Sequence, residues 1–261
     1  MERTDTKVRR LLTDKKSSRS NKYRTLIVGK SDWGTLLKYE LIMLLCSWLP
    51  GALGLFLRGK LYPLLLGRVG RGVIFGQNVT LRHPHKIFLG DNVVIDDNCL
   101  LDAKGVNNEG IFIGNDVFLG RNSILSCKDG DIYLEDGVNL GFNCEVFSSS
   151  RVTIGEKTLI AAYSYIVGGG NYDLDREAIS FAEQDGLASL GGIRIGHNCW
   201  LAAGVKVLDG VTIGNGAAIG AGAVVRQAIP ADSLAVGVPA RVIRSRTAAR
   251  AIAPSAQSQY G

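Results

Sequence analysis

The chain has 261 residues, of which 46% are hydrophobic and 21% charged, a composition that excludes a disordered polymer and fits one packed domain. The formal net charge is +6, yet residues 1–30 alone hold ten Lys or Arg against three Asp or Glu, so the rest is about neutral and its binding to nucleic acid is disfavoured. The five cysteines show neither metal-ligand spacing nor a disulfide framework, which indicates a reducing cytosol.

The first part of the chain divides into a basic segment and an apolar block. Residues 1–30 lack apolar periodicity and are predicted to form a disordered tail. Residues 31–68 are apolar, but their uncharged stretch, 41–57, is shorter than the about 20 residues of a membrane span and is interrupted by Pro-Gly. Two interpretations stay open. The block forms helices that cap the open end of the following repeat, or it forms an interfacial hairpin on the inner face of the membrane.

A six-residue repeat of aliphatic positions runs from Val69 to Val225. Six is neither a helix nor a strand period, and it is typical of hexapeptide parallel β-helices. Each hexapeptide is expected to form one short strand and its corner, and three hexapeptides to form one triangular coil. Residues 69–244 are therefore predicted to form an all-β, single-stranded parallel β-helix of about seven coils, followed by a disordered tail at 245–261.

The repeat also predicts where the chain departs from the prism. Every triplet of aliphatic positions is intact, so all extra residues must leave from one corner, after the third position of a coil. The longest excursion, at about residues 168–191, is the expected functional loop. Cys99, Cys144 and Cys199 fall on the small inward position of their hexapeptides and are predicted to be buried.

The run GHNCWLAAGVKVLDGVTIGNGAAIGAGAVVRQAIPADSLAVGVPARVI, residues 196–243, resembles the hexapeptide-repeat acyltransferases, a left-handed β-helix family of sugar and antibiotic O-acetyltransferases. The resemblance implies a left-handed prism, a homotrimer, and acetyl-CoA bound between neighbouring prisms. It implies that the pantetheine arm lies along Trp200, Ala203 and Ala221. The family often has a lysine before Ile-Pro, and since this chain lacks it, the cofactor phosphates would pair with Arg226, Arg241 or Arg244.

Acetyl transfer needs a base for the acceptor hydroxyl and donors for the oxyanion. By resemblance, Asn143 orients the acceptor or the base, and Tyr172 stands where close relatives commonly have a histidine in an Asn-His-Asp sequence. Tyrosine is a poor base near neutral pH because its ordinary pKa is about 10. The remaining candidates for the base are Asp173, His83 and His85.

The resemblance therefore implies a CoA-dependent O-acyltransferase that acetylates a sugar or lipid-linked sugar acceptor, in surface polysaccharide synthesis. It is expected in the cytoplasm or peripherally on the inner face of the membrane. The alternative is a non-catalytic trimeric scaffold that has lost the base. A zinc enzyme on the same prism is disfavoured, and no metal is expected, because His85 and His197 are five coils apart, or about 24 Å at 4.8 Å per coil.

Overall fold

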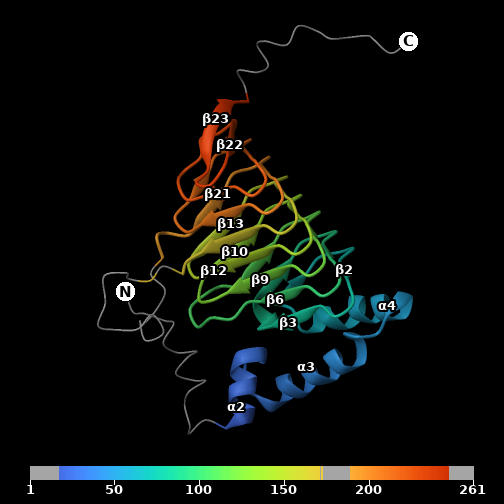
Figure 1. Ribbon diagram of the computed structural model, residues 1–261. Helices are drawn as coiled ribbons and strands as arrows, with labels where there is room; N and C mark the ends of the chain where they lie inside the picture. Colours follow the sequence, from blue (N-terminus) through green and yellow to red (C-terminus); the bar gives the residue numbers. More distant parts are fainter. Residues whose placement is uncertain (1–17, 171, 173–188, 247–261) are drawn as a thin grey trace, which may run out of the picture.

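The computed structural model describes residues 18–170, 172 and 189–246. Its body is a stack of triangular coils, with helices at the end where the chain enters and a two-stranded closure at the opposite end (Figure 1). Each coil contributes one strand to each of three parallel sheets, here called A, B and C.

The strands are short, and most have two to four residues. Sheet A consists of β1 (Arg68–Val69), β4 (Ile87–Leu89), β7 (Ile111–Ile113), β10 (Asp131–Leu134), β13 (Arg151–Ile154), β16 (Ile193–Ile195) and β19 (Thr212–Ile213). Sheet B consists of β2 (Ile74–Phe75), β5 (Val94–Ile95), β8 (Phe118–Leu119), β11 (Asn139–Leu140), β14 (Leu159–Ile160), β17 (Trp200–Leu201), β20 (Ala218–Ile219), β22 (Ser233–Val236) and β23 (Arg241–Ser245). Sheet C consists of β3 (Thr80–Arg82), β6 (Leu100–Asp102), β9 (Ile124–Cys127), β12 (Glu145–Ser148), β15 (Tyr165–Gly168), β18 (Lys206–Leu208) and β21 (Val224–Val225).

The pairing register reproduces the six-residue frame. Val69 pairs with Leu89, and the same column continues through the first aliphatic position of every later coil up to Ile213. The second and third positions pair in the same way in sheets B and C. The predicted fold class, a parallel β-helix of about seven coils preceded by a helical block, is confirmed.

The inward columns form the core. Cys99, Cys144 and Cys199 are at most 2% exposed, as are Ala217 and Ala223 in the same slot of the last coil, so the predicted small inward position is confirmed. All five cysteines are buried and free of disulfides. Every connection with extra length runs from a sheet C strand to the next sheet A strand, here called the C–A corner, as the intact triplets predicted.

The turn from sheet B to sheet C, here called the B–C corner, has one left-handed residue in each coil. Its φ angle is positive in all seven coils, at Asn78, Asn98, Asn122, Asn143, Tyr163, Gly204 and Gly222. Asparagine and glycine tolerate this conformation, whereas it is unusual for a bulky side chain such as tyrosine. The corner geometry thus explains an asparagine in four of the seven coils before any chemical role is considered.

Helices cover the first coil. They are α2 (Arg19–Tyr23), the π-helical turn η1 (Arg24–Val28), α3 (Trp33–Cys46), α4 (Gly51–Leu61) and the 3-10 turn η2 (Tyr62–Leu64); a second 3-10 turn, η3 (Pro84–Lys86), lies in the first C–A corner. The Tyr39 hydroxyl donates to the Leu81 carbonyl at 2.8 Å, and the Tyr62 hydroxyl donates to the Val79 carbonyl at 3.1 Å. The inner faces of these helices therefore pack on the first coil, as the capping interpretation of the apolar block predicts.

The helical region begins earlier than the sequence indicated. Residues 18–28, assigned to a disordered tail, are helical, with the Ser18 side chain capping α2. They are held because Val28 is fully buried and because the backbone amide of His83 donates to the Ile27 carbonyl at 2.8 Å. At the other end, β22 pairs with β20 and β23 folds back antiparallel on β22, which closes the prism beyond the repeat.

Arg58 joins the helices to the prism. It is 2% exposed, and its guanidinium donates to the carbonyl oxygens of Phe75, Cys46 and Leu49 at 3.0, 3.0 and 2.7 Å. The Arg58 side chain thus joins the segment between α3 and α4 to strand β2.

We predict that Arg58→Met lowers the free energy of unfolding by about 2–5 kcal/mol, because three buried carbonyls lose their donor. Urea unfolding followed by tryptophan fluorescence measures the loss. Lys60→Met, at an exposed position of the same helix, is the matched control and should change stability by less than about 0.5 kcal/mol. Equal stability of the two variants would contradict the assigned role of Arg58.

Candidate functional site

The B–C corner changes from large to small side chains along the prism. The residue before the left-handed position is Gln77, Asp97, Arg121 and Phe142 in the first four coils, and Ala162, Ala203 and Ala221 in the last three. These alanines follow one another in space, since the amide of Gly204 donates to the Ala162 carbonyl and that of Gly222 to the Ala203 carbonyl, both at 2.9 Å. A Cβ added at Gly222 would meet no heavy atom within 4 Å. The corner is therefore a narrow, open ledge.

Exposed residues of the kind that a nucleotide-bearing thioester requires occur on the last two coils and the closing strands. Trp200, on β17 of sheet B, is 50% exposed. Arg226 is exposed just beyond β21, and Arg241 donates to the Gln227 side chain at 3.1 Å, so both guanidinium groups lie at the same end of the prism. Arg244 is exposed further along β23. Guanidinium groups match phosphate oxygens in geometry and charge.

Asn143 and Tyr172, two of the predicted catalytic residues, lie at different corners of the prism. Asn143 occupies the B–C corner of the fourth coil, whereas Tyr172, 46% exposed, follows β15 at the C–A corner of the fifth. A four-residue strand of sheet C, about 13 Å long, separates these two edges. Asp173 lies outside the described residues.

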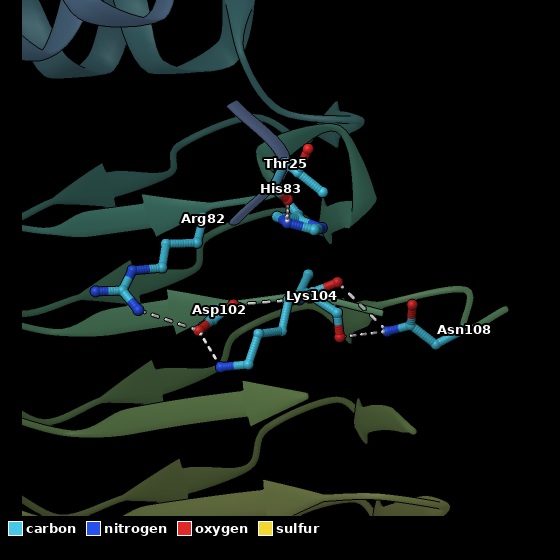
Figure 2. A network of polar contacts seen from close by, with 7 residues as sticks. Thr25, Arg82, His83, Asp102, Lys104 and Asn108 are labelled. Carbon is cyan, nitrogen blue, oxygen red and sulfur yellow. Dashed lines mark hydrogen bonds and ion pairs between the residues drawn. The ribbon is translucent and has the colours of Figure 1, made fainter. Parts of the chain in front are cut away.

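His83 and His85 contact the N-terminal helices instead of a substrate groove. His83 is 8% exposed, and its Nε2 donates to the Thr25 carbonyl at 2.9 Å (Figure 2). Burial lowers the pKa of His83. Burial and the neighbouring Lys30 lower the pKa of His85 to about 4. They follow β3, four coils from β15, or about 19 Å at 4.8 Å per coil, so they lie far from Tyr172.

A buried ion-pair network lies beside these histidines. Asp102 is 1% exposed and is reached by Lys104 Nζ at 2.7 Å and by Arg82 Nη1 at 3.5 Å (Figure 2). Lys86 Nζ donates to the carbonyls of Gly105 and Asn108 at 2.9 and 3.0 Å. These contacts fix the longer second C–A corner, and they account for the charged residues here without a catalytic role.

The sequence analysis missed a titratable column on the outer face of sheet C. Glu145, Tyr165 and Lys206 are consecutive register partners in coils four to six. Glu145 is partly buried, and desolvation raises the pKa of its carboxyl. Burial, and then the Glu145 charge, raises the pKa of the Tyr165 hydroxyl. A carboxylate with a raised pKa is a better general base. Counting outward positions from the repeat frame could have found this column.

Tyr163 was also missed. Its left-handed backbone, with φ 61°, and its 63% exposed side chain place a strained aromatic residue on the B–C corner, between Asn143 and Gly204. Its ring meets Phe142 edge-on, with 5.6 Å between centroids. Strained backbone of this kind concentrates at functional sites. Tyr163 thus belongs to the candidate site together with the alanine ledge.

A groove of about 460 Å³ on sheet A lies away from these residues. Phe88, Phe112 and Tyr133 stack there in parallel with centroids 4.8 Å apart, and Arg151 covers Tyr133. Because the rings cover one another's faces, they present mainly edges to the groove, and the stack stabilises strand pairing. We assign this groove no part in catalysis.

No group of three or more His, Cys, Asp or Glu that could hold a metal ion occurs among residues 18–170, 172 and 189–246. His197 is exposed just beyond β16.

Comparison with known proteins identifies the repeat. Residues 192–227 match the family described as bacterial transferase hexapeptide (six repeats). Together with the seven-coil prism, this match shows that residues 192–227 carry the repeat of the bacterial hexapeptide transferases.

Individual relatives carry acyl-transfer names. The chain is 34% identical over 171 residues to a probable acetyltransferase of Mycobacterium tuberculosis, covering 64% of this chain and 54% of the relative. It is 34% identical over 126 residues to an Escherichia coli protein provisionally named as a lipopolysaccharide biosynthesis O-acetyl transferase, covering 44% and 61%. The chain thus spans little more than half the length of these relatives. A variant of AntD, an N-acyltransferase from Bacillus cereus in complex with dTDP and coenzyme A, shares the fold at 22% identity, with a TM-score of 0.51 and coverage of 72% of this chain and 89% of that chain.

The histidine contacts predict acid-sensitive stability. The pKa of His85 is about 4 in the folded chain, whereas the ordinary value is about 6.5. As the pH falls, His85 therefore takes up a proton at a higher pH in the unfolded chain than in the folded chain. The contribution of neutral His85 to the free energy of unfolding is present above about pH 6.5 and is lost as the pH falls towards 4. His85→Gln should therefore reduce the fall in melting temperature between pH 7 and pH 4.5.

Thermal unfolding at several pH values measures this effect. His197→Gln, at an exposed histidine, is the matched control and should keep the wild-type profile. Parallel profiles for wild type and His85→Gln would show that the fall in stability arises elsewhere.

Proposed function

We propose that this protein is a CoA-dependent acyltransferase that moves an acetyl group from acetyl-CoA to a hydroxyl group of a sugar or lipid-linked sugar acceptor. The observation that carries the proposal is the open alanine ledge of coils five to seven, with exposed Trp200 in the sixth coil and exposed Arg226 and Arg241 at the same end of the prism. The names of the relatives support acyl transfer, and the lipopolysaccharide relative supports a glycan acceptor.

The donor binds along the prism axis in this proposal. Arg226 and Arg241 pair with the cofactor phosphates beyond coil seven, and the pantetheine arm runs along Ala221 and Ala203 towards lower coils. Small side chains allow a thin arm to lie close to the backbone. The thioester then reaches coil four, where Asn143 and Glu145 lie, about 14 Å from the last coil at 4.8 Å per coil.

The reaction requires one proton acceptor and one oxyanion donor. A base removes the acceptor hydroxyl proton as the oxygen attacks the thioester carbonyl, and collapse of the tetrahedral intermediate expels the CoA thiolate, which takes up a proton. Glu145 is the base favoured by its raised pKa and its place on sheet C. Tyr172 and Asp173, proposed from the sequence, remain the alternatives. The Asn143 amide orients the acceptor or stabilises the oxyanion.

A homotrimer completes the site in this proposal. The ledge and Tyr172 lie on opposite edges of sheet C, and in this proposal Tyr172 of one chain meets the ledge of a neighbouring chain. An apolar stripe on sheet B, including Phe118, Leu159 and Trp200 at 37–50% exposure, offers a surface for packing between prisms.

We predict that Glu145→Gln and Asn143→Gly each lower acetyl-CoA-dependent thiol release, Glu145→Gln by about 10²-fold or more. Glycine is chosen at position 143 because it keeps the left-handed corner, which alanine would strain. Asn122→Gly changes the same corner position one coil away and should keep full activity. The rate should rise with pH through a midpoint above the ordinary glutamate value of about 4.3, because burial raises the pKa of Glu145.

Each result of this assay has a distinct meaning. A full rate for Glu145→Gln with loss of rate for Tyr172→Phe assigns the base to the excursion loop. Unchanged rates for all these variants overturn the site. Binding of CoA without thiol release for any sugar acceptor favours the scaffold alternative.

We predict a trimer at micromolar concentration, with a mass three times that of one chain by light scattering. Because the site is shared between chains, co-assembly of the inactive Asn143→Gly chain with an inactive loop variant should restore part of the activity in mixed trimers. A monomer in solution, or no recovery in confirmed mixed trimers, would contradict the shared site.

A further inference from the structure

Helix α3 is apolar on two opposite faces. Tyr39, Ile42 and Cys46 are at most 5% exposed and face the first coil. A second apolar stripe follows helical spacing on the opposite side of the helix, and its side chains are 53–71% exposed. It consists of Trp33, Leu37, Leu41, Leu44 and, just beyond the helix, Trp48. A soluble helix normally turns polar residues to water, so a helix with apolar stripes on two opposite faces is expected to be covered on both.

Helix α4 repeats this arrangement. Gly54 and Arg58 are buried against the prism, whereas Leu53 and Phe56, on the opposite side, are 62% and 60% exposed. We call the seven exposed side chains of the two helices the outer face. Large exposed apolar side chains gathered on two neighbouring helices mark an interaction site.

The position of the outer face limits what can cover it. The helices lie at the entry end of the prism, beyond its first coil (Figure 1). Prisms that assemble side by side bury their sheets and corners, and they leave this end uncovered. In the trimer of the proposed function, three outer faces would point in one direction, as on a flat surface.

The charges around the outer face complement anionic lipid. Residues 18–66 hold seven Lys or Arg against two acidic residues, and all of these cations except Arg58 are at least partly exposed. Lys60 is exposed next to Phe56, with its Nζ 5.9 Å from the ring centre, so its stem lies along the apolar surface. Trp33 and Trp48 stand at the two ends of α3, and tryptophan is enriched at membrane–water interfaces.

We propose that the outer face of α3 and α4 is a docking surface for a bilayer with anionic head groups. Within the part of the chain that the structure describes, neither helix is long and apolar enough to cross a membrane, so the helices lie in the interface. Arg58 and the tyrosine hydroxyls then hold the prism on its membrane-bound helices. Membrane docking is independent of the acyl-transfer reaction, and its test uses no acyl donor.

Co-sedimentation of the full chain with vesicles tests the proposal. Wild-type protein should pellet with 3:1 phosphatidylcholine–phosphatidylglycerol vesicles, and its binding should fall in high salt and with pure phosphatidylcholine. The double variant Leu37→Glu/Leu44→Glu, at positions 71% and 70% exposed, should lower the partition coefficient by about tenfold or more and keep its melting temperature. The matched control is Val242→Glu/Ile243→Glu, which places the same charges on exposed apolar positions at the opposite end of the prism.

Fluorescence locates the contact. Brominated lipids in the same vesicles should quench Trp33 and Trp48 in a Trp200→Phe chain, and should leave Trp200 unquenched in a Trp33→Phe/Trp48→Phe chain. Absence of binding by the wild type, equal binding by both double variants, or quenching of Trp200 alone would overturn the proposal. An assembly larger than a trimer that Leu37→Glu/Leu44→Glu dissociates would also overturn it, by assigning the outer face to a second copy.

Discussion

The structure depends on the alignment of three inward columns of aliphatic side chains. A strand of two to four residues has no stability by itself, and each gains its backbone partners and its buried neighbours only from the coils on either side. The columns tolerate no inserted residue within a triplet, because a shift of one position would turn the inward side chains outward. Extra length can therefore leave only at the C–A corner, and both ends of the stack need a cover.

The same constraint decides where chemistry can be placed. Inward positions are occupied by the core, so titratable residues are confined to outward positions and corners. Glu145, Tyr165 and Lys206 stand above one another because their coils share one register. The alanine ledge arises in the same way, since three successive corners carry the same small residue. A groove along the prism axis is thus built from side chains that are far apart in the sequence.

The entry end of the prism holds both the contacts that anchor the helices and the surface proposed to bind a bilayer. Arg58 donates to three buried carbonyls, and His83 and His85 contact the turn η1, so the helices are fixed firmly to the first coil. An uncovered first coil would expose unpaired strand edges. The covering helices leave leucine, phenylalanine and tryptophan side chains of the outer face exposed to water, which is unfavourable. Contact with a lipid surface would remove these side chains from water.

The sequence by itself determined the coil count, the register and the corner from which the insertions leave, because a period of six constrains every buried position. It also determined that Cys99, Cys144 and Cys199 are core residues, because their slot in the hexapeptide points inward. The tertiary structure alone decided that His83 and His85 are covered by residues 18–28, since that contact joins segments almost sixty positions apart and has no periodic signal. It alone showed that burial raises the pKa of Glu145, and that Asn143 and Tyr172 lie on opposite edges of one sheet, because desolvation and the separation of two corners depend on the packing of neighbouring coils.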